Sequence, residues 1–323
     1  VGTCSQSEQF CSSPLSARHR VASQPKHTMD SSAASKRGDS LNAEGDKALN
    51  RTLIFGFGKA GKYEDAAEAF KNAGNAYKLA SLWQSAGDAF LKSADAHLVL
   101  ESSTDACSNV VEAAQCYKKI NPLDSVNAYR RAIDMYNEGG RFGMSARYCK
   151  EMAEVYEADS NAQGALEAYQ EAADLFVNDH KKSNANQCFL KVATLASDMG
   201  DLSRAAAIFE DIGKDSLTSR LGAYSAKGYF FQSLLCHLAL GDNVAVTQKL
   251  DSCKNLDFSF NGSRECEFID KLLQACEGMD LEAYSDACMD FDRVSPLDPW
   301  KTSLLLKAKA FIAEATGDEV DLS

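Results

Sequence analysis

Proline is scarce in this sequence of 323 residues. The prolines stand at positions 14, 25, 122, 296 and 299, so the stretch from 26 to 295 contains only Pro122. A β-rich or loop-rich domain of that length carries more turn-forming prolines, whereas helices exclude proline from their interior. The sequence therefore predicts a chain built mainly of helices.

Three other features are missing, and each absence excludes a class of protein. The eleven cysteines contain no Cys-x-x-Cys pair, which excludes closely spaced zinc ligands and argues against a disulfide scaffold, so we expect the thiols to be small core side chains. No run approaches the roughly 20 apolar residues that span a bilayer. The 46 acidic and 34 basic side chains give a net charge of −12, which argues against a dedicated nucleic-acid binder.

Catalytic and metal-binding motifs are missing as well. The five histidines form no metal-ligand pair, and neither Gly-x-Ser-x-Gly nor His-Glu-x-x-His occurs. The many carboxylates are expected on helix faces opposite the alanine and aromatic positions, where they would be solvated. We therefore expect no enzyme activity, no metal and no cofactor.

A glycine-rich segment interrupts the helical pattern at residues 56–62, Gly-Phe-Gly-Lys-Ala-Gly-Lys. It contains Gly-x-Gly-x-x-Gly and nearly matches a phosphate-binding loop, but Tyr63 stands where that loop needs Ser or Thr, and the sequence that follows is helical. Two interpretations remain, a flexible connection between helices and a shallow membrane anchor. The anchor would consist of apolar side chains flanked by positive charge, namely Leu53, Ile54, Phe55 and Phe57 beside Arg51, Lys59 and Lys62.

From residue 62 onward one short theme recurs, a small residue followed four positions later by an aromatic one. Because positions four apart share a helix face, each pair sets a small side chain beside a large one, ready to interlock with a neighbouring helix. The pairs are Ala66/Phe70, Ala73/Tyr77, Ala86/Phe90, Ala113/Tyr117, Ala132/Tyr136, Ala165/Tyr169, Ala172/Phe176, Ala185/Phe189 and Ala205/Phe209. A longer period of about 40 residues aligns Phe90, Tyr129, Tyr169 and Phe209.

Each 40-residue unit is expected to hold two helices joined by turn residues, as at 137–140, 178–180 and 198–201. A helical hairpin cannot bury both of its faces alone, so stacked hairpins form a solenoid. The predicted fold is all-α, a tetratricopeptide-like right-handed superhelix over residues 41–220, capped by a C-terminal helical bundle over 221–323. Residues 1–40 are expected to be a disordered leader, either transit-like or upstream of a start at Met29.

Charge is distributed unevenly along the chain. Between residues 118 and 191, ten basic side chains stand against eleven acidic ones, so a basic surface requires that the repeats bring the bases to one face. Ordinary solvated helix faces are the alternative. Residues 277–323 hold 11 acids and 4 bases and end in Asp321-Leu322-Ser323. Such an acidic tail is either simply solvated or a docking peptide for a basic partner.

Five segments resemble the soluble NSF attachment protein family, in its alpha type. They are residues 145–147 (Ser-Ala-Arg), 183–193 (Ser-Asn-Ala-Asn-Gln-Cys-Phe-Leu-Lys-Val-Ala), 224–231 (Tyr-Ser-Ala-Lys-Gly-Tyr-Phe-Phe), 263–266 (Ser-Arg-Glu-Cys) and 297–300 (Leu-Asp-Pro-Trp). The similarity extends from about residue 41 to the end of the chain. It implies a non-enzymatic adaptor that lies along the four-helix bundle of an assembled SNARE complex and recruits the hexameric ATPase NSF, which dismantles that bundle.

The resemblance also implies a place in the cell and a set of partners. The protein would be cytoplasmic and a weakly held peripheral protein on the cytosolic face of membranes, without nucleic-acid or small-molecule partners. A concave basic face would bind the SNARE bundle through Lys118, Lys119, Arg141, Arg147, Lys191 and Lys227. Gln187 stands where the family often has lysine, and Lys182 is a possible substitute.

The two remaining implied sites lie near the ends of the chain. The segment from Leu53 to Phe57 corresponds to the family's membrane-contacting loop. Binding and stimulation of NSF are assigned to Glu277, Asp318, Glu319, Asp321 and Leu322. The alternative of a different class is a generic helical-repeat scaffold that binds peptides without any link to an ATPase.

Overall fold

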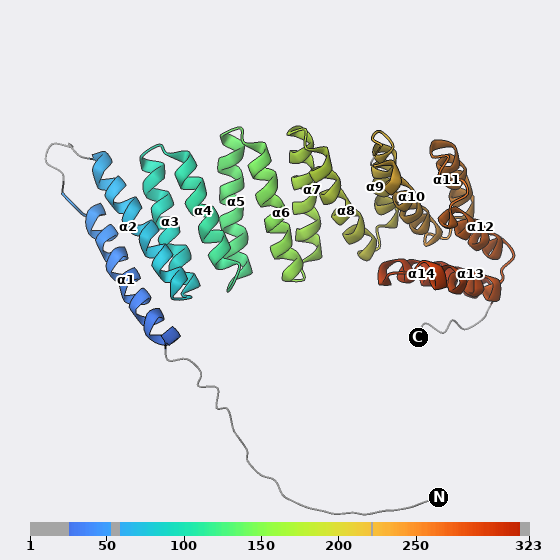
Figure 1. Cartoon of the computed structure of the whole chain (residues 1–323), viewed down its shortest axis with the longest axis horizontal. Helices are drawn as coiled ribbons and strands as arrows, with labels where there is room; N and C mark the ends of the chain where they lie inside the picture. Colours follow the sequence, from blue (N-terminus) through green and yellow to red (C-terminus); the bar gives the residue numbers. More distant parts are fainter. Residues whose placement is uncertain (1–25, 53–58, 221, 317–323) are drawn as a thin grey trace, which may run out of the picture.

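The computed structural model describes residues 26–52, 59–220 and 222–316, and every regular element in these ranges is a helix (Figure 1). The first ten helices are α1 (Lys26–Leu49), α2 (Lys59–Leu79), α3 (Trp83–Val99), α4 (Ser103–Tyr117), α5 (Pro122–Glu138), α6 (Phe142–Ala158), α7 (Ala162–Asn178), α8 (Lys182–Asp198), α9 (Leu202–Ser216) and α10 (Ala223–Leu238). They are followed by α11 (Asn243–Leu256), α12 (Arg264–Glu277), α13 (Leu281–Val294) and α14 (Pro299–Thr316). The predicted all-α fold is confirmed.

Helices α1 to α10 stack as a row of hairpins (Figure 1). Each helix also lies beside the next helix but one, as two ion pairs show. Lys78 on α2 pairs with Glu112 on α4 at 2.6 Å, and Lys92 on α3 pairs with Asp46 on α1 at 3.1 Å. The row therefore has two layers. We call α2, α4, α6, α8 and α10 the even layer, and α1, α3, α5, α7 and α9 the odd layer.

The core between the layers uses the predicted small–aromatic pairs. All the alanines of those pairs are 0% exposed, and their aromatic partners are buried except Phe189, which is half-buried. Glycine on a neighbouring helix often receives the ring: a Cβ atom on Gly74 would lie 2.9 Å from the Phe90 ring, and one on Gly87 would overlap the Tyr117 ring. Small residues thus set how closely the helices approach.

The predicted turns coincide with the last residues of α5, α7 and α8 and with the residues that follow them. Gly140 (φ +67°), His180 (φ +56°) and Gly200 (φ +91°) adopt the left-handed conformation just after α5, α7 and α8. A residue in this conformation ends a helix and reverses the chain, and glycine adopts it at the lowest cost. Side chains of Asn121, Asn161 and Asp201 then accept hydrogen bonds from backbone amides at the start of α5, α7 and α9.

The expectation of a disordered leader up to residue 40 is wrong for residues 26–40, which belong to α1. This helix packs on α2 through small residues: Gly38 lies against the Tyr77 ring and Gly45 against the Phe70 ring. The Tyr77 hydroxyl also donates a hydrogen bond to Asp39 at 2.9 Å. The rings of α2 supply the apolar surface of this contact. The sequence of α1 can therefore be largely polar although the helix is packed against α2.

Helices α13 and α14 lie across the ends of the preceding helices (Figure 1). The Trp300 indole at the start of α14 donates a hydrogen bond to the Ser197 hydroxyl of α8 at 3.1 Å and meets the Phe209 ring of α9 edge-on. The hydrophobic core continues from the hairpins into these helices without a break. The division of the chain at residue 220 therefore stays a prediction.

The cysteines occupy the positions expected of core side chains. Of the nine in the described ranges, all are buried except Cys288, which is half-buried. Burial raises the pKa of Cys116 and of Cys188 to about 11, so these thiols stay protonated at neutral pH. A protonated buried thiol is a small apolar group, as the sequence predicted.

Candidate functional site

The bases predicted to bind the SNARE bundle all lie on helices of the even layer or at the ends of those helices. Their side chains are exposed. Lys118 and Lys119 follow α4, Arg141 precedes α6, and the others stand within the helices, with Arg147 on α6, Lys191 on α8 and Lys227 on α10. The repeat thus brings to one layer residues that are up to about 110 positions apart.

These six bases do not form one compact cluster. Lys118 and Lys119 lie at the α4–α5 turn, whereas Arg141 lies at the α5–α6 turn, on the opposite edge of the row (Figure 1). Lys227 is separated from α6 by the whole of α8. The arrangement is a set of separate positive positions spread over the layer, which suits an extended partner better than a compact ligand.

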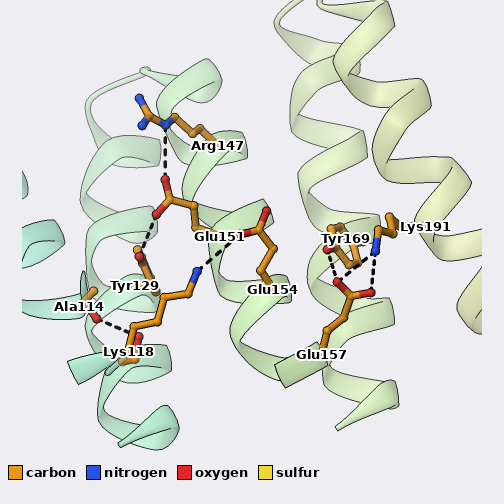
Figure 2. A network of polar contacts seen from close by, with 10 residues as sticks. Ala114, Lys118, Tyr129, Arg147, Glu151, Glu154, Glu157, Tyr169 and Lys191 are labelled. Carbon is orange, nitrogen blue, oxygen red and sulfur yellow. Dashed lines mark hydrogen bonds and ion pairs between the residues drawn. The ribbon is translucent and has the colours of Figure 1, made fainter. Parts of the chain in front are cut away.

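Carboxylates on α6 accompany three of the bases (Figure 2). Glu151 forms an ion pair with Arg147, with 3.5 Å between Oε1 and Nε, and Glu157 accepts a hydrogen bond from Lys191 Nζ at 2.9 Å. Glu154 lies 3.5 Å from Lys118 Nζ, and on α12 Glu265 lies 3.8 Å from Lys227 Nζ. The even layer is therefore a surface of mixed charge.

Two buried tyrosines donate hydrogen bonds to two of these carboxylates (Figure 2). The Tyr129 hydroxyl of α5 donates to Glu151 Oε2 at 2.8 Å, and the Tyr169 hydroxyl of α7 donates to Glu157 Oε2 at 2.7 Å. Burial, together with the adjacent carboxylate, raises the pKa of both phenols well above the ordinary value, so each keeps its proton and acts as a donor. Tyr129 and Tyr169 are equivalent positions of the 40-residue repeat.

Aromatic rings support the bases that have no carboxylate partner among the described residues. Lys119 Nζ lies 5.0 Å from the centre of the Trp83 indole, and the Arg141 guanidinium lies 5.3 Å from the centre of the Tyr136 ring. A cation over a ring face is attracted by the ring quadrupole. These contacts restrict where the two charges can move.

The other bases between residues 118 and 191 are divided between the layers: Lys150 and Lys182 lie on α6 and α8 of the even layer, and Lys181 directly precedes α8. Arg130 and Arg131 on α5 belong to the odd layer and pair with Glu171 and Asp95. Lys182 pairs with Asp215 at 2.9 Å, close to the end of α9. It stands about 140° around α8 from Gln187, so it does not replace a lysine at that position, and the suggested substitution is not supported.

Several predicted residues lie outside the described ranges. They are the apolar residues Leu53, Ile54, Phe55 and Phe57, and the tail residues Asp318, Glu319, Asp321 and Leu322. Glu277 is described and is exposed at the end of α12. Of the glycine-rich segment, Lys59 to Lys62 form the first turn of α2, and residues 56–58 lie outside the described ranges. The described element before it, α1, is a helix and not the strand that a nucleotide-binding motif requires.

The contribution of Glu151, Glu157, Tyr129 and Tyr169 was missed from the sequence. Only the spacing of Arg147 and Glu151, four positions apart on a helix, signals a pair. In residues 26–52, 59–220 and 222–316 no group of acidic, histidine or cysteine side chains could hold a metal ion. Within these same ranges no helix has the length and apolarity to cross a bilayer.

Comparison with known proteins agrees with this architecture. The family model described as "Soluble NSF attachment protein, SNAP" matches residues 36–313. The alpha-soluble NSF attachment protein of Mus musculus is 35% identical over 298 residues, covering 91% of this chain and 100% of that protein. The protein of the same name from Dictyostelium discoideum is 37% identical over 274 residues, covering 84% and 94%.

A relative with a different name matches over a similar length. The probable vesicular-fusion protein sec17 homolog of Schizosaccharomyces pombe is 33% identical over 263 residues, covering 81% of this chain and 91% of that protein. Because the family model spans most of the sequence and these relatives are matched nearly end to end, the chain belongs to the soluble NSF attachment protein family.

Proposed function

We propose that this protein is a non-enzymatic adaptor that binds assembled SNARE complexes and recruits and stimulates NSF, which then takes the complexes apart during membrane traffic. One observation carries the proposal on this chain's own residues: the six candidate bases share one layer of a helical solenoid. Membership of the family, whose relatives are named for NSF attachment and vesicular fusion, supports the same function.

The proposed mode of binding follows from the spread of the bases. An assembled SNARE bundle is a long rod with acidic groups on its surface, so Lys118, Lys119, Arg141, Arg147, Lys191 and Lys227 can each contact it at a different point. Charge and shape then supply most of the recognition, with little readout of sequence. One adaptor can accordingly serve several SNARE complexes.

The different charges of the two ends of the sequence support different roles for them. Residues 1–62 hold nine bases and five acids, whereas residues 277–323 hold four bases and eleven acids. We assign the segment Leu53–Phe57 to shallow contact with the cytosolic membrane surface, which anionic lipids would strengthen. The acidic end, with Glu277, Asp318, Glu319, Asp321 and Leu322, is assigned to NSF.

A disassembly assay with purified NSF, ATP and an assembled SNARE complex tests the adaptor function. We expect this protein to make release of the SNARE subunits dependent on ATP. A Leu322→Ala variant should still bind the SNARE complex but support slower release, while Ser323→Ala serves as the neighbouring control. Binding of the SNARE complex without any ATP-dependent release would identify the protein as a generic helical-repeat scaffold instead.

A further inference from the structure

Two of the candidate bases of the even layer are already paired with carboxylates within the molecule. Arg147 and Lys191 each face a glutamate of α6, Glu151 and Glu157 respectively. We propose that these two glutamates are built-in competitors that weaken the hold of the even layer on an acidic helical partner and so favour its release. This inference rests on the proposed function, because the partner in question is the SNARE bundle.

The exposure of the four side chains fits this role. The Arg147 and Lys191 side chains are 61% and 51% exposed, whereas those of Glu151 and Glu157 are 22% and 29% exposed. A partner can therefore reach the bases while the glutamates stay low on the surface. Long basic side chains can swing between a carboxylate of the partner and the glutamate beneath it.

The glutamates are fixed in place from the core. One carboxylate oxygen of each glutamate accepts a hydrogen bond from a buried tyrosine hydroxyl. The oxygen–oxygen distance is 2.8 Å from Tyr129 to Glu151 and 2.7 Å from Tyr169 to Glu157. The other carboxylate oxygen faces the basic side chain, Arg147 for Glu151 and Lys191 for Glu157. In Glu157 the tyrosine-bound oxygen also lies 3.2 Å from Lys191 Nζ. When a partner draws a base away, the hydroxyl keeps the glutamate where the base will return. Glu154 is more exposed, at 44%, and no described tyrosine donates to it, so it is a weaker competitor.

Two consequences follow for recognition. Binding exchanges an internal ion pair for an intermolecular one, so each contact gains less than a free base would. A fixed negative charge beside each base also repels acidic groups that are out of position, so it restricts where the partner's carboxylates can lie. Affinity is lowered and geometric selectivity is raised by the same two residues.

The test compares two double variants that make the same change of charge. Glu151→Gln with Glu157→Gln removes both competitors but keeps an oxygen for each tyrosine hydroxyl. The matched control, Asp95→Asn with Glu171→Gln, removes the carboxylates that pair with Arg131 and Arg130 on the odd layer. Binding of each protein to an assembled SNARE complex is measured by titration at low and at high salt, and thermal melting checks that each is folded.

We expect the Glu151/Glu157 variant to bind about three- to tenfold more tightly than the unmodified protein at low salt, and the control about as tightly as the unmodified protein. The gain should shrink at high salt, where charges are screened. Equal tightening in both variants, or unchanged binding in the Glu151/Glu157 variant, would overturn the inference. Failure of the unmodified protein to bind any SNARE complex would instead overturn the proposed function.

Discussion

Glycine residues that face aromatic rings determine how closely the helices of this solenoid pack. Gly38, Gly45, Gly74, Gly87 and Gly213 each lie against a ring from the next helix, where an added Cβ would come too close to it. Because these glycines sit inside helices, they cost backbone entropy relative to alanine. The close approach of two helices and the burial of a whole ring compensate for that cost.

We therefore expect Gly87→Ala to destabilise the protein by about 1–3 kcal/mol, because the new methyl group would overlap the Tyr117 ring. Gly228→Ala is the matched control, since Gly228 is also helical and, apart from its chain neighbours and the backbone of its own helix, no atom lies within 4 Å of its added Cβ. That change should stabilise by about 0.5–1 kcal/mol through helix propensity. Denaturant unfolding measures both, and equal stabilities for the two variants would refute this packing account.

Residue patterns in the sequence predicted this core only in part. The alanine–aromatic pairs are visible because both members lie on one helix at a fixed spacing. The glycines that receive the rings lie on other helices, 16 positions before Phe90 in the case of Gly74 and 30 before Tyr117 in the case of Gly87. A contact between separate helices has no fixed spacing and becomes visible only in the folded chain.

At the scale of helices, an ion triad joins α9 to α11. Glu210, whose side chain is 11% exposed, pairs with Lys214 of its own helix and with Lys249 of α11, each at 2.7 Å. Burial alone would raise the pKa of Glu210, but hydrogen bonds from the two lysines outweigh it and lower this pKa below the ordinary value of 4.5. The triad connects the last odd-layer helix to the C-terminal helices.

The sign of the pH effect follows from that lowered pKa. Ionised Glu210 stabilises the fold above pH 4.5, and this contribution is lost as the pH falls through the folded-state pKa. We expect Glu210→Gln to cost about 1–2 kcal/mol at pH 7 and progressively less in acid. Unfolding free energies measured from pH 7 to pH 3 check this, with Glu68→Gln on the exposed face of α2 as control. A cost independent of pH would contradict it.

Helices differ in how well the sequence predicted them. Those from α2 to α10 contain their own apolar residues and are separated by recognisable turns, so their pattern is clear. Helix α1 contributes mainly Gly38, Gly45 and Ala48 to its buried side, and the polar sequence of residues 26–40 predicts a disordered leader instead of a helix. Prediction from one chain segment fails when the partner segment supplies the large side chains.

At the scale of the molecule, the two layers differ in which bases they carry. The even layer bears the candidate bases for SNARE binding at spaced positions. The odd layer bears Arg130 and Arg131, which pair with carboxylates of neighbouring helices. The sequence predicted which bases to consider, since the family resemblance named them. It did not reveal the pairing of Glu157 with Lys191, because these residues are 34 positions apart and meet only through stacking of the repeats.

We propose that the even layer binds the SNARE bundle mainly through electrostatic contacts of its basic side chains. The most direct measurement is binding of an assembled SNARE complex at low salt to Arg147→Glu with Lys191→Glu, compared with Arg130→Glu with Arg131→Glu, after melting curves show that both are folded. Each variant reverses two ion-paired bases, one pair on each layer. The account predicts that binding is lost in the even-layer variant and kept in the odd-layer variant. Unchanged binding in the even-layer variant, or equal loss in both, would contradict it.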